Sequence, residues 1–191
     1  MSLKDGGFDK AVKLNIEYAI TYFNRGCVYY EKEEYDRAIT VFSKAIEINP
    51  DFTEAYFNRG LSYLWKEARS HYLSPDLDLQ KIYLALSDFN TTLLYNPEHY
   101  RAWHCRGMIY AMEGIYLVIP ISTIINNWAS GIKTVEKDRK DFINYEEAQR
   151  SFNEALRISP DFTAALLSRG KMYKEQKKYD QALNDFEAFY I

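Results

Sequence analysis

The chain has 191 residues, of which 47% are hydrophobic and 16% aromatic, so it can bury a substantial core and is not disordered. Its formal net charge of −3 argues against a sequence-independent nucleic-acid binder, which needs a basic face. Cys27 and Cys105 belong to no CxxC motif, which argues against a disulfide framework or zinc site and predicts a reduced, cytoplasmic setting. The most apolar stretch, residues 115–125, contains a Pro and is too short to span a bilayer, so we expect no membrane association.

Residues 1–18 are predicted to form an N-terminal helix that matches a pattern found later in the chain. Phe8, Ala11 and Leu14 have the spacing that recurs at Phe42, Ala45 and Ile48. We therefore expect residues 1–18 to be a remnant second helix of a preceding repeat, or a cap. At the other end, residue 191 falls inside a repeat, so a segment of a longer array is expected. A natural chain with a short N-terminal helix is the alternative.

Four related units follow, and a repeated pentapeptide reveals them. The letters YFNRG occur at residues 22–26 and again at residues 56–60. Aligning four Arg-Gly pairs gives glycine intervals of 34, 47 and 63 residues, so a 34-residue unit carries 13 extra residues in its second copy and 29 in its third. The shared positions are the glycines (Gly26, Gly60, Gly107, Gly170), a Tyr (Tyr29, Tyr63, Tyr110, Tyr173), an Ala and Phe pair (Ala38/Phe42, Ala85/Phe89, Ala148/Phe152, Ala182/Phe186) and a Pro (Pro50, Pro97, Pro160).

Each unit is predicted to form a helical hairpin, with helix A and helix B joined by a turn. Apolar residues recur at helical spacing, as in Ala38, Phe42 and Ala45. The repeated Gly lacks a side chain, which allows helix A to approach helix B closely, and the Pro ends helix B. The predicted units are residues 19–52, 53–99, 100–162 and an incomplete fourth unit, residues 163–191.

At nearly every one of these positions the chain resembles the tetratricopeptide repeat (TPR) family, over residues 19–191. The resemblance implies an all-α, right-handed solenoid of hairpins, with helical insertions in the A–B loops of repeats two and three. It also implies a non-catalytic protein–protein interaction scaffold. An alternative is a regulatory or substrate-docking segment of a larger enzyme whose catalytic domain lies elsewhere.

The two insertions are where the chain departs from the repeat. Residues 66–81 are expected to lengthen both helices of the second hairpin, with Ser74-Pro75 starting a helix. Residues 114–144 have an apolar first half and a densely charged second half, and we expect a short helix after Pro120. Two interpretations stay open: the insertion packs its apolar side chains against the fold, or it provides a lid or a self-association surface. The side chains in question are Ile119, Ile121, Ile124 and Trp128.

No residue pattern points to catalysis, to a metal or to a cofactor. His71, His99 and His104 are scattered along the sequence. The adjacent pair His104-Cys105 is a poor chelate, because neighbouring residues on a helix point about 100° apart. We therefore expect no enzyme activity, no catalytic residues, no metal site and no cofactor, and RNA binding is disfavoured by the acidic net charge.

The family resemblance places the expected partner-binding surface in a concave groove lined by the A helices. In relatives that grip chaperone tails, a clamp of Lys, Asn and Arg holds carboxylates. Only Asn58 and Arg101 match that clamp, whereas Phe23, Cys27 and Cys105 replace its other members. A protein or peptide partner with apolar anchors is therefore favoured, and a groove filled by the chain's own insertions is the alternative. The expected groove residues are Phe23, Asn24, Tyr30, Phe57, Asn58, Leu61, Trp65, Arg101, His104, Met108 and Lys171.

The Arg that precedes each repeated Gly recurs in all four units, whatever its neighbours. A residue with that regularity is expected to serve the scaffold, with its stem along an adjacent helix and its charge near a carboxylate or a helix end. These residues are Arg25, Arg59, Arg106 and Arg169.

Overall fold

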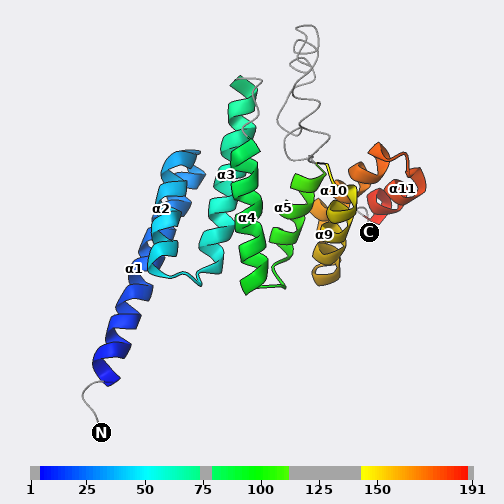
Figure 1. The fold of residues 1–191 in the computed structure, drawn as a ribbon. Helices are drawn as coiled ribbons and strands as arrows, with labels where there is room; N and C mark the ends of the chain where they lie inside the picture. The colour runs from blue at the N-terminus through cyan, green and yellow to red at the C-terminus, as the bar shows by residue number, and fades with distance from the viewer. Residues whose placement is uncertain (1–4, 74–78, 112–142, 189–191) are drawn as a thin grey trace.

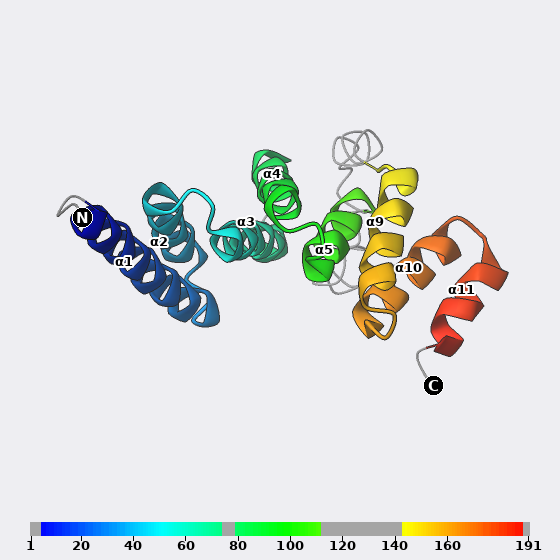
Figure 2. The ribbon, with the colours of Figure 1, turned by 90° about the horizontal axis from the view of Figure 1, so that it is seen from below.

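The computed structural model describes residues 5–73, 79–111 and 143–188, and within these ranges it is entirely helical (Figure 1). Helices pair into successive hairpins, and the hairpins follow one another in a row from the N-terminal to the C-terminal end (Figure 2). This arrangement confirms the predicted solenoid of hairpins. The helices are α1 (Asp5–Glu31), α2 (Tyr35–Ile48), α3 (Thr53–Leu73), α4 (Leu79–Tyr95), α5 (Tyr100–Tyr110), α9 (Tyr145–Ile158), α10 (Thr163–Glu175) and α11 (Tyr179–Glu187).

The repeated Gly is the point of closest approach inside each hairpin. A Cβ built on Gly26 would lie 2.5 Å from the ring of Phe42, and one built on Gly170 would lie 2.5 Å from the ring of Phe186. Distances this short are not tolerated between real carbon atoms, so the ring occupies the space that a side chain would need. The Phe of the sequence pattern thus packs against the Gly of the same unit.

Consecutive hairpins share apolar cores. The largest cluster combines Phe57 of α3, Phe89 of α4 and Ile109 of α5, so it crosses from the second hairpin into the third. A smaller cluster joins Leu156 of α9 to Leu166 of α10. Because each hairpin leaves one apolar face uncovered, stacking on the next hairpin is what completes its core.

The B helices α2 and α9 end just before a Pro, as predicted. Helix α2 ends at Ile48 and α9 ends at Ile158, each two residues before a Pro. The N–H groups of Asn49 and Ser159 still bond back to the helix carbonyls, and the Pro that follows cannot continue the ladder.

Helix α1 differs from the prediction at the N-terminus. It runs without interruption through the expected boundary between residues 18 and 19 and has 27 residues, so it combines the predicted N-terminal helix with helix A of repeat one. The reason is local: no Gly or Pro occurs between Phe8 and Arg25, and nothing therefore breaks the helix. In Figure 1 its first turns extend well past the end of α2.

The two insertions are described in part. Helix α3 continues to Leu73 and α4 begins at Leu79, so helical residues occupy much of the first insertion. Ser74-Pro75 and nearly all of the second insertion, including Pro120 and Trp128, lie outside the described residues. None of the helices in the described ranges combines the length and the apolar character that crossing a membrane requires.

Candidate partner-binding surface

The predicted groove residues lie on α1, α3, α5 and α10, the first helices of the four hairpins, and they differ widely in exposure. Asn24 and Arg101 are exposed. The half-buried residues are Phe23, Tyr30, Asn58, Trp65, Met108 and Lys171, and the buried ones are Phe57, Leu61 and His104.

Three half-buried side chains from successive hairpins meet the same apolar core. Tyr30 of α1, Trp65 of α3 and Met108 of α5 all pack against the cluster that contains Leu61 and Cys105. The indole N–H of Trp65 also hydrogen-bonds the Tyr30 hydroxyl, and burial raises the pKa of Tyr30 to about 12. We call Tyr30, Trp65 and Met108 the aromatic–methionine cluster. The fold brings these three predicted side chains to the same core, in which the predicted residues Phe57 and Leu61 are buried.

Arg101 places a positive charge beside this cluster. Its guanidinium lies 5.4 Å from the ring centroid of Phe57, a cation–π distance. Nearby, Nε2 of His99 lies 3.4 Å from Oε1 of Glu54, and the His99 hydrogen bond lowers the pKa of that carboxyl, with Arg101 adding to the effect. The surface therefore carries both an exposed cation and an acidic group beside apolar side chains.

Other predicted residues are engaged within the fold. The ring of Phe23 lies 5.7 Å from that of Phe42 and 4.9 Å from that of Phe52. The amide of Asn58 donates to the Glu54 carbonyl at 2.7 Å. Phe57 and Leu61 are core residues of the large cluster, so they form the floor beneath the aromatic–methionine cluster.

His104 joins the third hairpin to the fourth. Its Nε2 lies 3.0 Å from the Ser168 hydroxyl of α10, and its ring meets that of Phe162 at 5.2 Å. Burial lowers the pKa of His104 to about 4, against an opposing hydrogen bond to the Ala164 backbone. The imidazole is therefore neutral near pH 7 and acts as a polar contact within the stack.

The periodic Arg residues have structural roles in three of the four repeats. Arg59 binds Asp88 through two hydrogen bonds of 2.9 and 2.7 Å, and Arg169 binds Asp185 in the same way at 2.8 and 2.6 Å. Arg106 binds Glu147 at 2.7 Å. The prediction that these side chains serve the scaffold is confirmed for these three repeats.

Repeat one breaks this pattern, a feature that the sequence reasoning missed. The residue before the motif Phe is Asp88 in repeat two and Asp185 in repeat four; repeat three has Ser151 there and uses Glu147 instead, whereas repeat one has Val41 and, in place of Glu147, Arg37. Arg25 is consequently exposed and hydrogen-bonds the Tyr29 hydroxyl at 3.0 Å. The signal was present in the sequence: repeat one has no acidic residue at either of the two positions, one and five residues before the motif Phe, that supply the carboxylate in the other repeats.

A metal site finds no support in the described ranges, where no three His, Cys, Asp or Glu side chains converge in a way that suits a metal ion. Of the two cysteines, Cys105 is buried, and burial raises its thiol pKa to about 12.

Comparison with known proteins agrees with this architecture. Models of the TPR repeat match residues 26–65 and residues 143–190. No curated protein sequence matches the chain.

Similar solved structures share the fold at low sequence identity. A MamA fragment from Desulfovibrio magneticus RS-1 has a TM-score of 0.61 and 16% identity, over 98% of this chain and 86% of that one. The TPR domain of Arabidopsis OM64 has a TM-score of 0.57 and 17% identity, over 84% and 98%. The first TPR domain of Spaghetti (RPAP3), bound to the HSP90 peptide SRMEEVD, has a TM-score of 0.57 and 19% identity, over 84% and 94%. The repeat motifs, the hairpin solenoid and the two matches to TPR models together support a TPR family for the chain.

Proposed function

We propose that the chain is a non-catalytic protein-interaction scaffold that binds a segment of a partner protein across its A helices. The family assignment supports this class of function, and a similarly folded domain, that of RPAP3, is bound to a peptide. The partner itself has to be inferred from the chemistry of the surface.

The observation that carries the proposal is the aromatic–methionine cluster. Tyr30, Trp65 and Met108 come from three successive hairpins, and each keeps part of its side chain accessible while the rest is held by the core. Half-buried aromatic side chains bind partners well because their orientation is already fixed, and Met adapts to varied shapes. The apolar side chains of a partner segment are the matching chemistry.

Arg101 gives this surface a preference for acidic ligands. An exposed guanidinium beside an apolar surface favours a ligand with a carboxylate near its apolar anchors. We therefore propose a partner segment with two or three large apolar residues and at least one acidic residue.

This chemistry differs from a chaperone-tail clamp. Cys105 is buried, Phe23 is held between two aromatic rings, and the Asn58 amide already donates to the Glu54 carbonyl. Three of the side chains at clamp positions are therefore poorly placed to hold a terminal carboxylate. We expect the peptide SRMEEVD to bind more weakly than an apolar peptide of equal length.

The test is selection of binders from a displayed random-peptide library, followed by affinity measurement with Trp65→Ala and Met108→Ala. Selected peptides should be rich in large apolar residues, and each substitution should weaken binding by about tenfold or more. Leu94→Ala is the matched control, because Leu94 is an apolar residue on α4 and is 76% exposed. Thermal unfolding would verify that all three variants remain folded. Loss of binding in the Leu94 variant, with retention in the other two, would place the site elsewhere.

A further inference from the structure

We propose that the first hairpin carries a second binding site, outside the A-helix surface, in which Arg25 receives an Asp or Glu carboxylate from a partner protein. Arg25 lacks the carboxylate partner that its equivalents in the other three repeats have. It goes beyond the proposed function, since Arg25 belongs to none of the residues assigned to the partner-binding surface.

The equivalent Arg residues show what this position binds. Arg59 and Arg169 each present Nε and Nη2 to the two oxygens of an Asp on helix B of the same hairpin. This paired geometry is the strong, charge-assisted mode of carboxylate recognition by Arg. The position thus binds a carboxylate through two hydrogen bonds in repeats two and four, and Arg106 of repeat three binds that of Glu147.

Arg59 and Arg169 also have a second partner, on the preceding hairpin. Nη1 of Arg59 donates to the Ser43 hydroxyl of α2 at 3.0 Å, and Nη1 of Arg169 donates to the Asn153 side chain of α9 at 2.6 Å. Each Arg therefore joins its own helix B to the helix B before it.

Arg25 lacks both kinds of partner within the described residues. Val41 stands where repeats two and four have an Asp, and Arg37 stands where repeat three has Glu147, the carboxylate that pairs with Arg106. The residues that precede repeat one continue α1 itself and form no earlier hairpin there. The guanidinium rests on Tyr29, with Nη2 3.0 Å from the hydroxyl and Cζ 5.4 Å from the ring centroid. A neutral hydroxyl is a weaker acceptor than a carboxylate, which would displace it.

The surroundings of Arg25 suit an incoming anion. An open hollow of about 470 Å³ lies between α1 and α2 and is lined by Arg25, Tyr29, Asp36, Arg37, Thr40 and Val41. Arg37 lies near the same Tyr29 ring, at 5.7 Å, and is paired with Glu34 at 2.6 Å, while Asp36 is paired with Lys66. Among the described residues that line the hollow, Asp36 and Arg37 each have an ion-pair partner, whereas Arg25 has none.

The proposed occupant is an acidic side chain of a protein because the site repeats an internal arrangement. In repeats two and four the carboxylate comes from a helix that packs beside the Arg. The hollow would receive the same group from outside, with the Tyr29 hydroxyl free to donate to it once released from Arg25.

The site can be tested by NMR with an acetylated, amidated tetra-aspartate peptide as the probe and a tetra-asparagine peptide as its neutral control. The Nε–Hε signal of Arg25 can be assigned by its absence from the spectrum of Arg25→Lys. Its chemical shift should move downfield as tetra-aspartate is added and reach a plateau, and it should not change with tetra-asparagine. The signals of the exposed Arg150 and Arg157 should change far less.

Val41→Asp supplies the missing carboxylate from within the chain. In the peptide-free variant, the Arg25 Nε–Hε signal should have the chemical shift that it has in the wild-type protein saturated with tetra-aspartate. The affinity of the variant for tetra-aspartate should fall by about tenfold. Val41→Asn has the same shape without the charge and should keep wild-type affinity. Equal affinities for these two variants, or equal shifts at Arg25, Arg150 and Arg157, would overturn the proposal.

Because Val41 is 8% exposed, its substitution with Asp requires a check on folding. Arg25→Gln affects an exposed side chain and provides an independent arm. It should abolish saturable binding of tetra-aspartate and leave unchanged the affinity for peptides selected against the aromatic–methionine cluster. Persistent saturable binding in this variant would also overturn the proposal.

Discussion

Gly107 lies so close to Phe152 that a Cβ built on it would come 2.6 Å from the ring. The same relationship holds for Gly60 and Phe89, although there the nearest ring atom is 2.9 Å away. The repeated Gly and the repeated Phe are therefore two halves of one contact between helix A and helix B.

We predict that Gly107→Ala destabilises the protein by about 1–3 kcal/mol, because the ring of Phe152 would have to move within a packed core. This effect opposes the gain of up to about 1 kcal/mol that Ala normally brings to a helix. Urea unfolding measures the difference. Adding Phe152→Leu to the Ala variant should recover part of the loss. An Ala variant as stable as the wild type would mean that the ring has room to shift.

The second prediction concerns pH. The folded pKa of His104 is about 4 because the ring is buried, whereas an unfolded His titrates near 6.5. Between these values the unfolded state binds more protons, so the His104 contribution to stability is present above about pH 6.5 and is lost as the pH falls towards 4. We expect the free energy of unfolding to be about 2 kcal/mol smaller at pH 5 than at pH 7 on account of this residue.

Urea titrations at the two pH values test this dependence, with His104→Gln as the control. The Gln side chain can still hydrogen-bond Ser168 but does not titrate, so its variant should lose about that much of the pH dependence. An unchanged pH dependence in the variant would contradict the assignment.

The third prediction concerns thiol reactivity. Burial raises the pKa of the Cys105 thiol to about 12, whereas Cys27 is only partly buried and its thiol pKa is raised by burial and by Glu31. Because the thiolate is the reactive form, Ellman's reagent should modify Cys27 much faster than Cys105 in the folded protein. Both thiols should react in guanidinium chloride. Cys27→Ser should remove the faster phase, and rapid labelling of Cys105 in that variant would show that the core around it opens.

The fourth prediction concerns the ion pair of Arg59 with Asp88. Burial raises the pKa of the Asp88 carboxyl, and the guanidinium of Arg59 opposes that shift. Asp88→Asn would leave a largely buried guanidinium without its counter-ion, so we expect a loss of about 2–4 kcal/mol in unfolding free energy. Glu34→Gln is the comparison: it removes an exposed ion pair with Arg37 and should change stability by about 0.5 kcal/mol or less. Equal effects of the two substitutions would rule out a special role for the periodic Arg.

The repeat positions were enough to predict the hairpins and their internal contacts. Gly, Ala and Phe at fixed spacing determine how two helices pack, and this local relationship is visible in the sequence. The same reasoning did not predict that α1 continues through residues 18 and 19, because alignment to the repeat suggests a boundary while the residues themselves contain nothing that breaks a helix.

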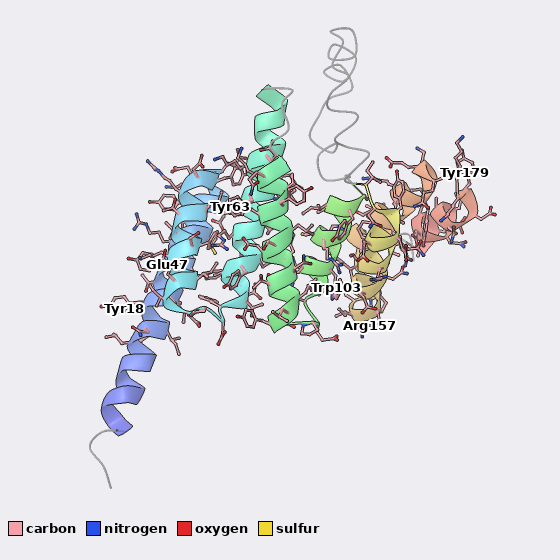
Figure 3. The ribbon with its side chains drawn as sticks, viewed as in Figure 1. Tyr18, Glu47, Tyr63, Trp103, Arg157 and Tyr179 are labelled. Atoms are coloured by element: carbon pink, nitrogen blue, oxygen red, sulfur yellow. The ribbon has the colours of Figure 1, made fainter. Side chains whose placement is uncertain are left out.

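The predicted groove shows a second limit of sequence reasoning. Position within a repeat indicates which way a side chain points, but its burial depends on how closely the neighbouring hairpins approach. Phe57, Leu61 and His104 are covered by such neighbours, whereas Asn24 and Arg101 stay exposed. Figure 3 illustrates the same dependence outside the groove: the labelled Tyr18 lies on the part of α1 beyond α2, and it is 53% exposed despite its aromatic ring.

In mechanical terms, α1 is a lever arm. Its 27 residues span about 40 Å at the usual helical rise, whereas α2, its partner in the hairpin, has 14 residues and spans about 21 Å. A continuous helix transmits rotation along its length, so a torque applied near Asp5 would turn the first hairpin as one body, with no joint at residues 18–19 to absorb it. A distance probe at the start of α1 would therefore magnify small changes in the tilt of that hairpin.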